Sequence, residues 1–213
     1  IAILETHFPK RGVKVLDSSE LLQYLNIKTK AANRGSKSRA SFANHYAIYV
    51  LVEDYINHGF HKRNDYDEYE GAQFSVLFRR QRELPFGSKL QNHALNHRLN
   101  EEFKKYFPTS SHLPIIRDVE SNRYWINENL LKVSIDKKTI NIALPVKEII
   151  DSYVEARRKA FDAFMSYCQK MMDIQQQEPQ AAMEFIRGLL HPNIDARVFE
   201  IVSYAILKQY YSD

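Results

Sequence analysis

The residues most suited to chemistry form a basic stretch in the first quarter of the chain. No acidic residue occurs between Glu20 and Glu53, and residues 10–50 hold eight Lys and Arg against two Asp and Glu. Lys and Arg contact phosphates, whereas Arg, Ser, Asn and Gln at a helix start can reach base edges in the major groove. The stretch therefore predicts DNA contacts from Lys28, Lys30, Arg34, Lys37, Arg39, Ser41 and Asn44.

A second basic cluster begins with the run Arg79-Arg80-Gln81-Arg82 and continues beyond the turn signal Pro85-Phe86-Gly87. We predict a second DNA-contacting surface here, formed by Arg79, Arg82, Lys89 and Gln91. Over both clusters, the expected phosphate contacts are Lys28, Lys30, Lys37, Arg79 and Lys89, and the expected base readers are Arg34, Arg39, Asn44, Arg82 and Gln91.

Two patterns resemble metal sites. His93 and His97 have the i, i+4 spacing of helical ligands, but no third ligand is evident, so a polar helix face is preferred and no metal site is predicted. Asp118 with Asp136-Lys137-Lys138 matches the acid and acid-x-Lys pattern of Mg²⁺-dependent nucleases, in which carboxylates hold the metal. The second acid also fits a plain hairpin turn, which is the preferred interpretation.

Composition excludes several protein classes. The chain has 213 residues, a net charge of +4 and an ordinary hydrophobic fraction of 44%, so disorder is not its main state. Its single cysteine, Cys168, excludes paired-cysteine zinc sites and favours a reducing, cytoplasmic location. No glycine-rich phosphate-binding motif and no run long enough to span a bilayer occurs, so neither a nucleotide nor a membrane is an expected partner.

These residues must be positioned by a mixed set of elements. The capping signal at 17–20 predicts a helix to about Asn26, and a second helix from Ser38 or Ser41 to Gly59 completes a helix-turn-helix-like element. Further expectations are a strand over 73–83, a helix over 88–106 and a hairpin of 124–133 with 139–144. Three more helices are expected after the hairpin: a long one over 145–174, a short one that ends near 190, and a last one over 195–211.

The predicted fold class is α+β and mainly helical, with a helix-turn-helix-like element, a small antiparallel β component and a helical C-terminal third. A DNA-recognition region over 1–144 and a helical region over 145–213 are expected. The last helix is apolar on nearly all sides, so Glu200 within it should be shielded, and Arg197 or Lys208 could be its ion-pair partner.

The segment from Phe199 to Lys208 resembles the helix that opens the catalytic core of some type II restriction endonucleases. The segments Ser38–Tyr55 and Gly71–Tyr106 are similar to recognition regions of such enzymes. The resemblance implies an N-terminal recognition part for double-stranded DNA, with Glu200 as an accessory catalytic acid. The catalytic core and its Mg²⁺ would then lie beyond residue 213, with no cofactor in this chain and a homodimer left open.

Two other functions stay open. One is a Mg²⁺-dependent nuclease active within this chain, which would use Asp118, Asp136 and Lys138. The other is a non-enzymatic transcriptional regulator, which would use the same basic clusters on DNA. A protein-interaction module would leave those clusters unexplained.

Overall fold

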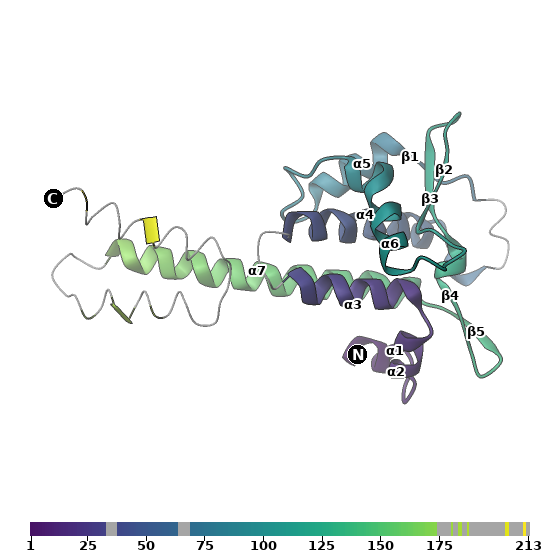
Figure 1. The fold of residues 1–213 in the computed structure, drawn as a ribbon, viewed down its shortest axis with the longest axis horizontal. Helices are drawn as coiled ribbons and strands as arrows, with labels where there is room; N and C mark the ends of the chain where they lie inside the picture. The colour runs from purple at the N-terminus through teal and green to yellow at the C-terminus, as the bar shows by residue number, and fades with distance from the viewer. Residues whose placement is uncertain are drawn as a thin grey trace.

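A computed structural model describes residues 1–32, 38–63 and 69–173, together with 180, 183–184, 187, 203–204 and 211. It shows a mainly helical α+β fold with small antiparallel sheets and a long helix near the C-terminal end (Figure 1). The predicted fold class is confirmed. The helices are α1 (Ala2–His7), α2 (Gly12–Asp17), α3 (Glu20–Ala32), α4 (Ser38–Asn57), α5 (Phe74–Glu83), α6 (Leu99–Tyr106) and α7 (Ala143–Asp173).

Helix α4 is the centre of the fold. Every residue from Phe42 to Val52 is buried, and α3, α5, α7 and the sheet strand β3 (Arg123–Ile126) all contact this helix. It ends as predicted before Gly59, which adopts a left-handed φ of 77° that glycine accommodates without strain.

Helices α3 and α4 confirm the predicted pair of helices, and they lie side by side in Figure 1. Helix α3 is longer than predicted, because it continues beyond Asn26 to Ala32. The added turn carries Lys28, whose side chain packs inward and pairs with Glu102 of α6. The connection at 33–37 lies outside the described residues.

The predicted strand over 73–83 is wrong, because this segment forms helix α5. Phe74 and Phe78 stack one helical turn apart, with ring centroids at 6.1 Å, while Leu77 and Gln81 complete the inward face. Val76, which fitted the strand alternation, is 55% exposed. The helical spacing was hidden because one of its buried positions is a polar glutamine.

The helix expected from Ser88 begins later, so that prediction is wrong for its first turn. Residues 88–92 form turns, and a π-helical turn (Ala94–Arg98) precedes α6. Lys89 and Gln91 therefore lie on the connection from α5 to this π-helical turn, and not on a helix. Short 3₁₀ turns occur at Phe60–Lys62 and Glu128–Leu130.

Two small antiparallel sheets provide the β component. One has the order β1-β3-β2, with β1 at Ala72–Gln73 and β2 at Ile115–Asp118. The other pairs β4 (Lys132–Ile135) with β5 (Lys138–Asn141). Its two-residue turn, Asp136-Lys137, has φ values of 51° and 63°, as a tight hairpin requires. The predicted strand over 124–133 is divided between the two sheets.

Helix α7 begins at Ala143, close to the predicted start, and the side chain of Asn141 accepts a hydrogen bond from its first amide. Among the α7 side chains that the structure describes, the last buried apolar one is Val154, and the second half of the helix extends away from the body (Figure 1). Glu200 and the two helices expected after residue 174 lie outside the described residues. Among the helices described, none has the length and apolar character needed to cross a bilayer.

Candidate nucleic-acid interface

Helix α5 carries one half-buried arginine that is bound by a carboxylate and two exposed arginines that are not. The Arg80 guanidinium donates to both carboxylate oxygens of Glu53, at 2.7 and 3.0 Å, and this hydrogen bonding raises the pKa of Arg80. The neighbouring Gln81 is fully buried and donates to the carbonyl of Ala43 at 3.1 Å. These contacts fix α5 on α4 and leave Arg79 and Arg82 on the opposite, exposed side.

The exposed cations of this region have no carboxylate partner among the described residues. Neither Arg79, Arg82 nor Lys89 forms an ion pair within the described part of the chain. Arg82 is held in place differently, since its Nε and one terminal nitrogen donate to the carbonyl of Ser88 at 2.9 and 2.6 Å. This contact joins the end of α5 to the segment that presents Lys89 and Gln91. We call Arg79, Arg82, Lys89 and Gln91 the α5 surface.

The turn between α5 and Lys89 is rigid. A Cβ atom on Gly87 would lie 2.2 Å from the carbonyl oxygen of Gln81 and 2.7 Å from that of Leu84. The buried Tyr46 hydroxyl donates to the carbonyl of Pro85 at 2.5 Å. Sequence reasoning found this turn but missed the two residues, Tyr46 and Gln81, that anchor it, because their partners are distant backbone carbonyls.

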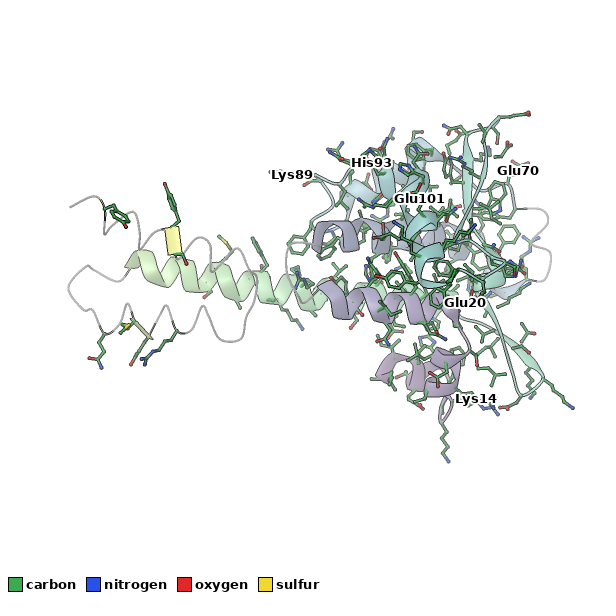
Figure 2. All side chains as sticks on the ribbon, viewed as in Figure 1. Lys14, Glu20, Glu70, Lys89, His93 and Glu101 are labelled. Carbon is green, nitrogen blue, oxygen red and sulfur yellow. The ribbon has the colours of Figure 1, made fainter. Side chains whose placement is uncertain are left out.

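The π-helical turn continues the polar region beside the α5 surface. Lys89 and His93 both lie along the upper edge of the body in Figure 2. His93 and His97 are exposed, with ring centroids 5.8 Å apart. Within the described part of the chain, no group of three or more His, Cys, Asp or Glu side chains is arranged to hold a metal ion.

The first basic stretch is placed very differently. Lys28 is 8% exposed, with its Nζ 3.3 Å from a carboxylate oxygen of Glu102. Asn44 is fully buried; its amide nitrogen donates to the Tyr24 hydroxyl at 2.8 Å and to Glu102, and its oxygen accepts from Arg98 at 3.3 Å. These two side chains belong to a polar cluster inside the fold, which we call the Glu102 cluster.

Arg34 and Lys37 lie outside the described residues, as do the side chains of Lys30, Arg39 and Ser41. Their predicted DNA contacts stay predictions. The structure leaves the four named side chains of the second predicted cluster exposed, and it draws Lys28 and Asn44 from the first cluster into the core.

The acids of the alternative nuclease site are not brought together. Asp118 accepts hydrogen bonds from Ser121 Oγ at 2.6 Å and from the Glu120 amide at 3.0 Å, and these bonds lower its pKa. Asp136 pairs with Lys14 of α2, which lowers the pKa of Asp136. The two acids lie at the tips of the β2–β3 and β4–β5 hairpins, which point in opposite directions in Figure 1.

Comparison with known proteins adds no relative: no family model, curated protein or solved structure matches the chain. The functional argument therefore depends on the side chains themselves. Their clearest feature is the contrast, within one helix, between an arginine bound by a carboxylate and two arginines that are not.

Proposed function

We propose that this chain binds double-stranded DNA in a sequence-specific manner through the α5 surface, as the recognition part of a type II restriction endonuclease. The observation that carries the proposal is the exposure of Arg79, Arg82 and Lys89 without carboxylate partners in the described residues. Such cations suit the phosphate backbone, because each contact releases condensed counterions and adds to affinity.

The geometry supports a division of roles on this surface. Arg79 and Lys89 offer flexible charged groups for phosphates. Arg82 is oriented by its two hydrogen bonds to Ser88, so the N–H groups that remain on its two terminal nitrogens have a fixed direction, as recognition of a guanine edge requires. Gln91 is exposed on the same connection, and its amide can both donate to and accept from an adenine edge.

The class of protein is supported by the resemblance of 38–55, 71–106 and 199–208 to restriction endonucleases. Under this proposal Glu200 is an accessory acid and Mg²⁺ belongs to the full-length enzyme, beyond the residues described. A transcriptional regulator would show the same binding without cleavage. Assay of the full-length gene product for Mg²⁺-dependent cleavage separates the two.

Fluorescence anisotropy on a labelled duplex tests the binding. We expect the triple variant Arg79→Ala, Arg82→Ala, Lys89→Ala to flatten the slope of log affinity against log salt by about 2, since the phosphate contacts of Arg79 and Lys89 contribute about 0.9 each, and to lose the base contact of Arg82 as well. The matched control removes three exposed lysines elsewhere, with Lys62→Ala, Lys138→Ala and Lys159→Ala. Equal losses in both variants would show general charge attraction and would contradict a defined surface.

A further inference from the structure

We propose that Arg157 of α7 is a further phosphate contact of the same interface, so that bound DNA continues from the α5 surface onto α7. This inference rests on the proposed function. Neither basic cluster in the sequence includes Arg157, and no ion pair of this residue occurs among the described residues.

Aromatic contacts place α7 against the turn that follows α5. The ring of Phe86, in that turn, lies 5.8 Å from the ring of Phe161 of α7. Closer to the core, Phe42 lies 5.4 Å from Tyr153 and 5.6 Å from Phe86. Tyr153, Arg157 and Phe161 follow one another at four-residue spacing, so they share one ridge of the helix. Arg157 therefore lies between two residues whose rings contact the α4 and turn side.

The acids of α7 lie on the other side of the helix. Glu148, Asp151, Glu155 and Asp162 are spaced by three, four and seven residues, which places them on one face, roughly opposite Arg157. Neighbouring cations form ion pairs with two of these acids. Lys147 lies 3.1 Å from Asp151, while Arg158 and Lys159 lie 3.0 and 3.9 Å from Glu155.

Arg157 and Arg158 are thus adjacent in sequence but differ in environment. Arg158 has a carboxylate partner and points with the acidic face, whereas Arg157 is the cation of the ridge that adjoins Phe86. The turn that bears Phe86 also leads to Lys89. A duplex whose phosphate backbone contacts Lys89 would meet Arg157 next, since the rings of Phe86 and Phe161 connect the turn to α7. No described acid lies on that ridge between Tyr153 and Phe161 to repel it.

The two arginines supply a matched test. We expect Arg157→Gln to weaken duplex binding by up to about eightfold at 0.1 M salt and to flatten the salt slope by about 0.9, the share of one phosphate contact. Arg158→Gln should change affinity less than twofold, although it removes the same charge one residue away. Both variants should keep the wild-type circular dichroism spectrum, which checks that α7 is intact.

Failure of this inference is distinguishable from failure of the proposed function. If Arg157→Gln matches Arg158→Gln while the α5-surface triple variant loses binding, DNA does not reach α7 and the inference is overturned. If the triple variant binds as the wild type does, the proposed function itself is wrong. Losses in both Arg157→Gln and the triple variant, with Arg158→Gln unchanged, support a continuous surface.

Discussion

The two basic regions of this chain are similar in composition, but the side chains that the structure describes in them have opposite environments. In the first, Lys28 and Asn44 turn inward, and Glu102 from a distant helix accepts hydrogen bonds from both. In the second, Arg79, Arg82 and Lys89 stay in solvent, and the carboxylates of Glu53 and Glu83 both lie within ion-pair distance of Arg80. The difference teaches that the location of the nearest acid, and not the density of positive charge, decides which cations are available to DNA.

Among the substitutions that test this comparison, Glu102→Ala is expected to have the largest effect, and the effect is on stability. The change removes the acceptor of Tyr24, Asn44 and Lys28 together, so we expect the free energy of unfolding to fall by about 2–4 kcal/mol. The exposed neighbour Glu101→Ala should change it by less than about 0.5 kcal/mol. Urea denaturation measures both. Equal effects would mean that the Glu102 cluster is not a structural unit.

A smaller effect, on binding, is expected from Gly87→Ala. A Cβ atom has no room against the Gln81 and Leu84 carbonyls, so the turn must shift and carry Arg82 and Lys89 with it. We expect duplex affinity at 0.1 M salt to fall by about tenfold, because the phosphate contact of Lys89 and the base contact of Arg82 are both disturbed.

Gly59→Ala is the control for that experiment. Gly59 has a left-handed φ but open space around its Cβ position, so alanine there should reduce stability without affecting DNA binding. Anisotropy and thermal melting on the two variants separate the outcomes. Unchanged affinity in Gly87→Ala would contradict the role given to the turn.

The smallest effect compares single lysines from the two regions. Lys89→Met should flatten the salt slope by about 0.9 and cost up to about eightfold in affinity at 0.1 M salt. Lys28→Met should leave the slope unchanged at a temperature where the protein is folded, because its Nζ faces Glu102. A flatter salt slope for Lys28→Met would mean that Lys28 contacts DNA phosphate, and it would contradict the burial-based distinction between the two regions.

Sequence reasoning predicted those features of the fold that depend on a few consecutive residues. The end of α4 at Gly59 and the turn at Asp136-Lys137 follow from backbone preferences of a few residues, and both were predicted. Helix α5 was missed because its inward face includes Gln81, whose partner is a backbone carbonyl 38 residues earlier in the chain. Burial of Asn44 was missed for the same reason, since its carboxylate partner is 58 residues away. The exposure of Arg79, Arg82, Lys89 and Gln91 could be predicted because it depends on no distant partner, and their contacts with DNA stay a prediction.

The most direct test of the central claim is site-specific photocrosslinking to a labelled duplex. A photoreactive phenylalanine analogue replaces Gln91 on the α5 surface in one protein and Lys138 on the β4–β5 hairpin in another; both positions are exposed. We predict protein–DNA adducts from position 91, suppressed by high salt, and none from position 138. Adducts from position 138 with none from position 91, at equal binding, would contradict the account.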